Sequence, residues 1–245
     1  MTTPRRIEIL GVPVDAVGMA DTLAFADRHV AEGEGCATIV AVNPEKAMRA
    51  RHDGSLLSLL RGATLLIPDG IGIVWAARVL GLGRFGRVPG SELMPNLCAL
   101  AAGKGYSVFL YGARPEVNAA AVEALGRRFP GLRIAGCQHG YLAEDAKPEL
   151  VRRINESGAD MVFVALGSPA QEDWMAQYAP ALQAKLCQGV GGTFDVLAGR
   201  VRRAPKLFLS LNLEWLYRLL REPSRIGRQL ALLGFAWKVL LAKFG

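Results

Sequence analysis

The feature that most constrains the fold is a regular alternation of short apolar runs with longer helical patterns, extending from residue 7 to about residue 200. Several of the short runs are almost entirely apolar, as strands covered on both faces of a sheet should be. Parallel strands need long crossover connections, which the helices supply. The sequence therefore predicts an α/β protein with a mostly parallel, Rossmann-like sheet. Strands are expected at residues 7–10, 38–42, 64–67, 107–111, 132–135, 161–166 and 186–190.

The chain is expected to form two tightly packed halves and a helical appendage. A glycine-containing stretch at residues 103–106 separates residues 1–104 from residues 105–199, and no long linker lies between them. Residues 200–245 form the appendage. Helices are expected from Asp15, as an N-cap, to about residue 30, at 72–80, at 93–102, from Pro115 to about residue 128, at 208–220 and at 224–242, with a break at Pro223.

Positive charge is concentrated in the appendage. The whole chain has a formal net charge of +7, yet ten basic residues and only two acids lie from Arg200 onward, so the body is close to neutral. The spacing of Arg218 and Arg221, and of Arg225 and Arg228, places each pair on one helix face. Leucine, tryptophan and tyrosine side chains of the same segment add apolar surface. This pattern predicts an anionic membrane surface as partner, with packing on the body or on a second subunit as the alternative.

Composition excludes several other classes of protein. Hydrophobic residues make up 51% of the chain, which excludes intrinsic disorder. The four cysteines form no CxxC pair and only three histidines are present, so a reduced, zinc-free protein is expected. No signal peptide and no apolar run of about 18 residues is found. A cytoplasmic protein that does not cross a bilayer is therefore expected.

Polar residues follow two predicted strands of the first half. Asn43 comes directly after the run at 38–42, and Asp69 lies just beyond the run at 64–67. Ligands of open parallel sheets bind beyond the carboxyl ends of the strands. Asn43 can donate and accept hydrogen bonds, and a partly desolvated Asp69 can take a proton from an attacking hydroxyl. Helix capping is the alternative for both residues.

An arginine and a series of glycine turns complete the candidate site. Arg87 lies in a glycine-flanked loop, where a guanidinium can bind a diphosphate through two hydrogen bonds, although most arginines are simply surface residues. Glycine turns follow three strands of the second half, and their N–H groups suit a nucleotide diphosphate. Tight turns of any α/β sheet are the alternative reading. The glycines of these turns are Gly112, Gly167, Gly191 and Gly192.

Absent motifs narrow the choice of function. The DxD pattern that holds a metal–nucleotide complex in many sugar transferases is missing, so no divalent ion of that kind is expected. A nicotinamide-dependent oxidoreductase is an alternative, but it needs GxGxxG followed by an acid about 20 residues on, and that combination is missing. A nucleic-acid-binding module is a second alternative, but the appendage is rich in leucine rather than in stacking aromatic residues. No nucleic-acid partner is therefore expected.

Seven stretches together resemble the WecG/TagA/CpsF family of bacterial glycosyltransferases, over nearly the whole chain. They are VNPEK (42–46), IPDGIGIVWAARVLG (67–81), GRVPGSELM (86–94), VFLYGARPEV (108–117), ALGSPAQEDWM (165–175), GVGGTFDVLAGRVRRAP (189–205) and LNLEWLYRLLREPSRIGR (211–228). Within the family, the chain looks most similar to xanthan-type exopolysaccharide members. One departure is Ala41, which stands where many members carry a threonine.

The resemblance implies roles for individual residues. Asp69 corresponds to the proposed catalytic aspartate, Arg87 to the active-site arginine, and Asn43 and Gln171 to polar pocket residues. Catalysis and acceptor binding fall in residues 1–104, and nucleotide-sugar binding falls in residues 105–199. The membrane-directed arginines of the family correspond to Arg218, Arg225 and Arg228, with Arg221 close by.

The resemblance also implies a reaction. A hexose, with glucose favoured, passes with inversion and without a metal from a UDP-sugar to a polyprenyl-diphosphate-linked saccharide, in exopolysaccharide or other cell-surface polysaccharide synthesis. The enzyme would act peripherally at the inner face of the cell membrane, without a cofactor. Transfer of N-acetylmannosamine in teichoic acid or enterobacterial-type antigen assembly is the alternative within the family. Packing of the leucine-rich appendage helices between subunits would give a homo-oligomer.

Overall fold

The computed structural model describes residues 4–201, 217 and 226–244, and it confirms the α/β class. Six strands, each overlapping a predicted range, form one parallel sheet: β3 (Ala37–Val42), β4 (Leu65–Pro68), β5 (Ser107–Gly112), β6 (Arg133–Gln138), β7 (Met161–Ala165) and β8 (Leu186–Gly189). Their order across the sheet is β4-β3-β8-β7-β5-β6. The central strands are buried along their whole length, which explains their continuous apolar runs.

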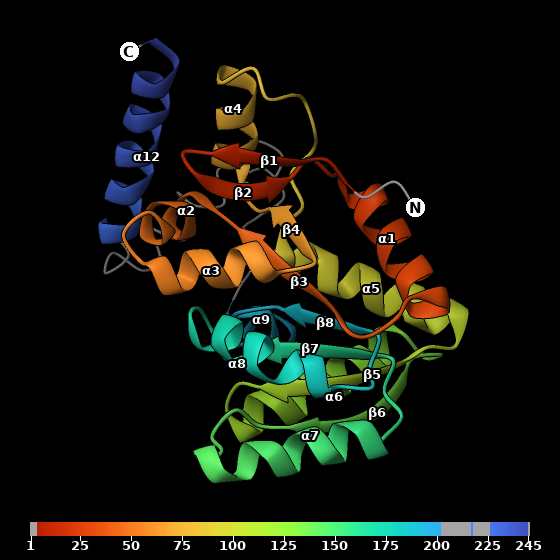
Figure 1. Cartoon of the computed structure of the whole chain (residues 1–245). Helices are drawn as coiled ribbons and strands as arrows, with labels where there is room; N and C mark the ends of the chain where they lie inside the picture. Colours follow the sequence, from red (N-terminus) through yellow and green to blue (C-terminus); the bar gives the residue numbers. More distant parts are fainter. Residues whose placement is uncertain (1–3, 202–216, 218–225, 245) are drawn as a thin grey trace.

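Helices cover both faces of this sheet (Figure 1). One face packs against α2 (Pro44–Ala50), α3 (Gly54–Gly62), α7 (Lys147–Glu156) and α8 (Ala170–Tyr178). The other face packs against α1 (Met19–Glu32), α5 (Gly90–Lys104), α6 (Pro115–Arg128) and α9 (Thr193–Leu197). Two short 3-10 helices lie at Glu144–Ala146 and Ala179–Ala181. The apolar core is therefore divided by the sheet into two layers.

The strands of the two predicted halves lie in the same sheet. Strand β3 from the first half pairs with β8 from the second, with Ile39 opposite Gln188. Helix α5 ends at Lys104 and is capped by Gly105 in the left-handed conformation, which is where the boundary between the halves was predicted. The halves thus share one sheet and its two core layers. Their division into functional units stays a prediction.

A short antiparallel hairpin precedes the sheet, and it corrects one prediction. Strands β1 (Arg6–Ile9) and β2 (Val12–Asp15) pair with each other, whereas the sequence was expected to begin a helix at Asp15. Asp15 is buried at the end of β2, where its carboxylate accepts hydrogen bonds from Arg6 Nε at 2.8 Å and from the backbone N–H of Leu66 at 2.7 Å. The prediction of Asp15 as an N-cap was wrong because this carboxylate joins the hairpin to β4. Helix α1 begins instead after Gly18.

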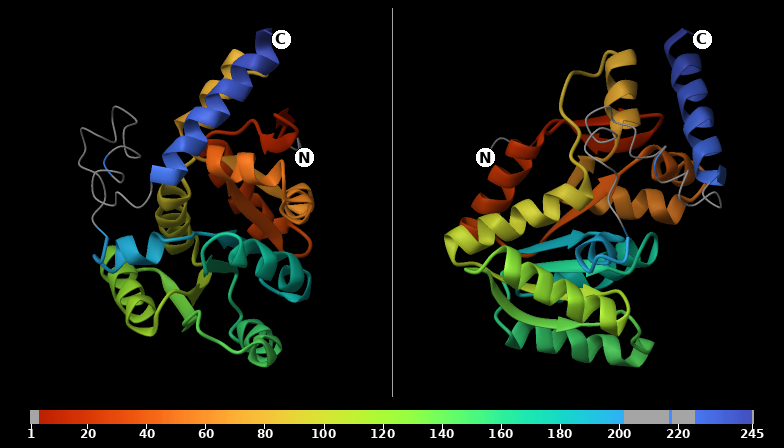
Figure 2. Two further views of the ribbon diagram at one scale, coloured as in Figure 1. Left: turned by 90° about the vertical axis from the view of Figure 1, so that its left-hand side faces the viewer. Right: turned by 180° about the vertical axis from the view of Figure 1, so that it is seen from behind.

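The C-terminal helix α12 (Ile226–Phe244) lies beside α2 and α4 (Ile71–Val79), as both views of Figure 2 show. Phe235 and Val239 on its inner side are buried. The predicted helix at 208–220, the break at Pro223, and the residues Arg218, Arg221 and Arg225 lie outside the described residues. Arg228 belongs to α12, but its side chain also lies outside the described part. No helix of the described residues is long and apolar enough to span a membrane.

Candidate active site

Asn43 and Asp69 lie next to each other at the carboxyl edge of the sheet. Strands β3 and β4 are neighbours in parallel register, so the residues that follow them meet at the same edge. The backbone N–H of Asp69 donates to the carbonyl of Val42 at 2.8 Å, which fixes the start of the Asp69 loop beside Asn43. The Asp69 side chain is half-buried. The structure therefore brings together two candidates that stand 26 residues apart in the sequence.

Arg87 is held at the same corner. The backbone N–H of Val88 donates to the carbonyl of Pro68 at 2.8 Å, so Arg87 lies beside the end of β4, close to Asp69. The Arg87 side chain is half-buried, and its Nη2 lies 3.7 Å from Glu92 Oε1 on the first turn of α5. A pair at this distance and exposure binds weakly. The guanidinium therefore retains donors for an incoming anion.

Asp69 does not occupy the N-cap position of α4. That position belongs to Gly70, which has φ +88°, a conformation that strongly favours glycine. A Cβ atom on Gly72 would lie 2.6 Å from Pro44 Cγ, which shows how closely the start of α4 packs on the start of α2. The loops that carry Asp69 and Asn43 are thus fixed to each other by the packing of Gly72 on the Pro44 ring as well as by a hydrogen bond.

Asn43 does cap its helix, as one of the two readings of the sequence predicted. Its Oδ1 accepts a hydrogen bond from the backbone N–H of Lys46 at 2.8 Å, at the start of α2. Pro44 occupies the first helical turn, also as predicted. The carboxamide nitrogen of Asn43 has no acceptor among the described residues. Capping therefore leaves this N–H₂ group to donate to a ligand.

A buried polar chain crosses from this corner to the second half. Lys46 Nζ donates to the carbonyl of Ala41 at 2.7 Å and contacts Glu172 Oε1 at 2.6 Å. The same carboxylate oxygen accepts from Gln171 Nε2 at 3.0 Å, and Gln171 Oε1 accepts from the backbone N–H of Gly191 at 2.9 Å. The Gln171 side chain is therefore a link between α8 and the loop after β8. The N–H group of Gly191 is occupied by this link.

The loops after β5 and β7 lie farther along the carboxyl edge, toward β6. The connection after β5 leads to β6 on one side, whereas the connection after β7 leads to β8 on the other, so the strand order reverses here. Gly112, at φ +123°, ends β5, and a Cβ atom there would lie 2.4 Å from the carbonyl oxygen of Ala165. Gly167, at φ +76°, follows β7. Ligands of open α/β sheets commonly bind at such a reversal.

Tyr111 is not a candidate base, although it precedes Gly112. Its hydroxyl is buried without a hydrogen-bond partner among the described residues, next to the ring of Trp174 at 5.0 Å between centroids. Burial raises the pKa of Tyr111 to about 12. The hydroxyl therefore stays protonated at neutral pH.

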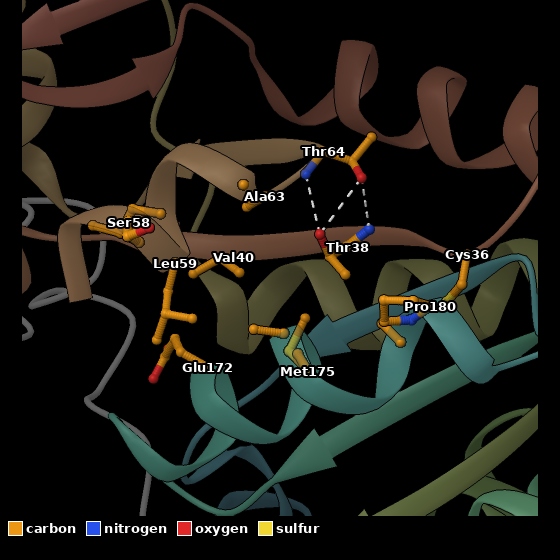
Figure 3. Close-up of a pocket in the computed structure, with 14 residues that line it drawn as sticks. Cys36, Thr38, Val40, Ser58, Leu59, Ala63, Thr64, Glu172, Met175 and Pro180 are labelled. Carbon is orange, nitrogen blue, oxygen red and sulfur yellow. Dashed lines mark hydrogen bonds between the residues drawn. The ribbon is translucent and has the colours of Figure 1, made fainter. Parts of the chain in front are cut away.

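Two cavities lie away from these loops. One, of about 500 Å³, is lined by Arg78, Gly81, Gly83 and Arg84 beyond the end of α4. The second, of about 280 Å³, lies between α3 and α8, and its lining includes Thr38 and Thr64, which are joined by hydrogen bonds (Figure 3). Neither cavity has Asp69 or Arg87 in its lining. Within the described residues, no group of three His, Cys, Asp or Glu side chains is placed to hold a metal ion.

Sequence reasoning missed Lys46 and Glu172. Both belong to stretches that carried the resemblance, but neither was given a role. Lys46 is 7% exposed and Glu172 is 3% exposed, although charged residues are rarely buried unless they are paired. A lysine on the inner face of a short helix was the available signal, but its partner lies 126 residues away in the sequence.

Together these features define a Rossmann-like α/β protein with a polar site on the loops at the carboxyl edge of its sheet. Residues 7–245 match the model of the glycosyl transferase WecG/TagA/CpsF family, and the chain belongs to that family. It is accordingly a glycosyltransferase of cell-surface polysaccharide synthesis. Family membership also implies, in general terms, a sugar-nucleotide donor and a lipid-linked acceptor.

Proposed function

We propose that this enzyme moves a hexose, with glucose favoured, from a UDP-sugar to a polyprenyl-diphosphate-linked saccharide, with inversion at the anomeric carbon and without a metal ion. The observation that carries this proposal is the meeting of Asp69, Arg87 and Asn43 at the ends of β3 and β4. A carboxylate, a guanidinium and an amide are the groups that a single displacement at a sugar diphosphate needs. Family membership supports the same class of reaction.

In this mechanism Asp69 is the general base. Its carboxylate takes the proton of an acceptor hydroxyl while that oxygen attacks the anomeric carbon, and the bond to the UDP oxygen breaks on the opposite face. Arg87 stabilises the charge that develops on the departing diphosphate through paired N–H donors. Asn43 donates its free carboxamide N–H₂ to a sugar hydroxyl. Inversion follows because attack and departure occur on opposite faces.

The loops of the second half bind the nucleotide in this proposal. The turns at Gly112 and Gly167 flank the reversal of strand order, where a diphosphate can approach the backbone. Gln171 supports the neighbouring loop at Gly191 and Gly192 rather than pointing to an open site. Nucleotide and acceptor would thus meet between the loops after β5 and β7 and the loops after β3 and β4.

A donor screen tests the proposed function. Purified protein is incubated with a synthetic polyprenyl-diphosphate saccharide and with UDP-glucose, UDP-N-acetylglucosamine or UDP-N-acetylmannosamine, in the presence of either EDTA or Mg²⁺. Transfer from UDP-glucose with an inverted linkage, unchanged by EDTA, is the expected result. Transfer from UDP-N-acetylmannosamine alone would favour the alternative within the family. Binding of NAD without binding of UDP by calorimetry would contradict the proposal.

The enzyme is further proposed to lie peripherally on the inner face of the cell membrane, where its acceptor is found. Supporting this, the outer side of α12 exposes large apolar side chains at helical spacing. Trp237 is 64% exposed and Phe244 is 81% exposed, and Lys238 and Lys243 lie on the same helix. Such a combination suits the interface of an anionic bilayer. The exposed residues of this face are Leu233, Trp237, Leu240, Leu241 and Phe244.

Replacing Trp237 with Ser is expected to weaken binding to anionic vesicles by about tenfold, because the loss of one buried aromatic side chain costs about 1.5 kcal/mol. Sedimentation with phosphatidylglycerol-containing vesicles measures the partition coefficient. Tyr141→Ser is the matched control, since Tyr141 is 69% exposed but lies outside α12. Equal binding of the Trp237 variant and the wild type would show that α12 does not contact the bilayer.

A further inference from the structure

The longest-range contact of the site is the buried ion pair between Lys46 and Glu172. Lys46 Nζ lies 2.6 Å from Glu172 Oε1, and their side chains are 8% and 2% exposed. Lys46 belongs to α2 in the first half, whereas Glu172 belongs to α8 in the second. The pair thus joins the two halves directly.

Lys46 also fixes the segment on both sides of Asn43. Its backbone N–H donates to Asn43 Oδ1 at 2.8 Å, and its side chain donates to the carbonyl of Ala41 at 2.7 Å. The position of Lys46 thus determines the direction of the Asn43 carboxamide and of the last residues of β3. A displacement of Lys46 would move the Asn43 loop away from its neighbour at Asp69.

Glu172 fixes the opposite loop through Gln171. Because Glu172 Oε1 accepts from Gln171 Nε2, the carboxamide of Gln171 is oriented with its oxygen toward the N–H of Gly191. A Cβ atom on Gly189 would lie 2.8 Å from Gln171 Nε2, so the glycine leaves space for this arrangement. The orientation of Gln171, and through it the loop after β8, depends on an acceptor at position 172.

A buried pair of charges is not an efficient way to stabilise a fold. Desolvation of both groups offsets much of their attraction, and well-packed apolar residues of similar volume often serve as well. Glu172 Oε2, in addition, is buried without a hydrogen-bond partner among the described residues. A pair that is poorly suited to stabilising the fold, but that connects two loops of the site, suggests a role in the reaction.

We propose that Lys46 and Glu172 are positioning residues, which hold the Asn43 loop and the Gly191 loop at the separation that the transfer reaction needs. This inference rests on the proposed function, because it assigns the acceptor side to the first loop and the nucleotide side to the second. Small displacements of reacting groups are costly: a shift of about 1 Å can lower a rate by about 10²-fold.

The test uses single and double replacements to distinguish an effect on the stability of the protein from an effect on the geometry of the site. Lys46→Met and Glu172→Met are each expected to lower the melting temperature, because each leaves one buried charge without a partner. The double variant restores apolar packing and is expected to melt close to the wild type. Its kcat/KM for sugar transfer is nevertheless expected to be 10- to 100-fold lower, with an increase in KM for the UDP-sugar.

Two further variants complete the design. Glu172→Gln keeps an oxygen acceptor for Gln171 but leaves Lys46 without its counter-charge, so it is expected to melt below the wild type. Its kcat/KM is nevertheless expected to stay within about threefold of the wild type, because the acceptor that orients Gln171 is kept. Lys104→Met combined with Asp27→Met is the control, because this partly exposed 3.0 Å pair joins α5 to α1 away from the site. The control is expected to leave kcat/KM unchanged.

Amide hydrogen exchange at Gly191 provides a readout that does not depend on activity. Exchange is expected to accelerate in the double methionine variant and to stay slow in Glu172→Gln, because only the latter keeps the acceptor that orients Gln171. Wild-type kcat/KM in the double variant, or unchanged exchange at Gly191, would overturn the proposal. If the wild type transfers no sugar, the proposed function fails, and the exchange measurement alone then supports or overturns the positioning of Gly191 by this pair.

Discussion

Replacing Asp69 with Asn is expected to lower turnover by about 10²–10⁴-fold while the protein still folds, because that range is what a general base contributes. The amide is nearly the same size as the carboxylate but cannot accept a proton from the acceptor hydroxyl. The contact that fixes the loop is made by the backbone N–H of Asp69, which the substitution keeps. Turnover of UDP-hexose with saturating acceptor measures the loss.

A matched variant distinguishes the loss of the general base from the mere loss of one negative charge. Asp173→Asn removes an exposed carboxylate from the first turn of α8 and is expected to leave turnover unchanged. The melting temperature of both variants is compared with that of the wild type, and UDP affinity is measured by calorimetry. An Asp69→Asn enzyme with the turnover of the wild type would remove this residue from the role of base.

Most of the sheet is predictable from the sequence because its strands are buried on both faces. Such strands must be apolar throughout, so β5 and β7 appear as unbroken runs that few other structures produce. Helix α6 begins at Pro115 and ends at Arg128, as predicted, because proline at a helix start and basic residues in the last turn mark both ends.

The N-terminal hairpin was less predictable. Strand β1 overlaps the strand predicted at 7–10, and its side chains alternate between exposed and buried. Strand β2 was missed because its four residues are all buried and do not alternate, and because an aspartate before a helical pattern is a common N-cap. What decides the structure is the bond from the N–H of Leu66 to the Asp15 carboxylate, across 51 residues of sequence. No local pattern contains that information.

The candidate site, too, could be predicted only in part from the sequence. Asn43 and Asp69 were found because residues after parallel strands lie at one edge whatever the details of the fold. The sequence offered helix capping and ligand binding as alternatives for Asn43. The structure is compatible with both, because the side-chain oxygen caps the helix and the nitrogen is left open. The ion pair of Lys46 and Glu172 could not be predicted without the strand order of the sheet, since the pair depends on β3 lying beside β8.

Replacing Arg87 with Gln is expected to lower turnover with UDP-hexose by about 10²–10³-fold, the usual effect of removing one preorganised donor from a site where negative charge develops. Its partner Glu92 lies 3.7 Å away and both side chains are partly exposed, so folding loses little. Arg87→Lys is expected to recover only part of the loss, because an ammonium group cannot make the paired hydrogen bonds of a guanidinium. Arg84→Gln, in the same loop and exposed, is the matched control.

The leaving group distinguishes the role of Arg87 from that of Asp69. An aryl glycoside with a nitrophenolate leaving group, unlike a UDP-sugar, has no phosphate oxygens that a guanidinium could bind through paired hydrogen bonds. With that donor, the defect of Arg87→Gln is expected to shrink to about tenfold or less, whereas the defect of Asp69→Asn stays the same, because activation of the acceptor hydroxyl is still needed. Equal defects of the arginine variant with both donors would place Arg87 outside the stabilisation of the leaving diphosphate and assign it to general substrate binding.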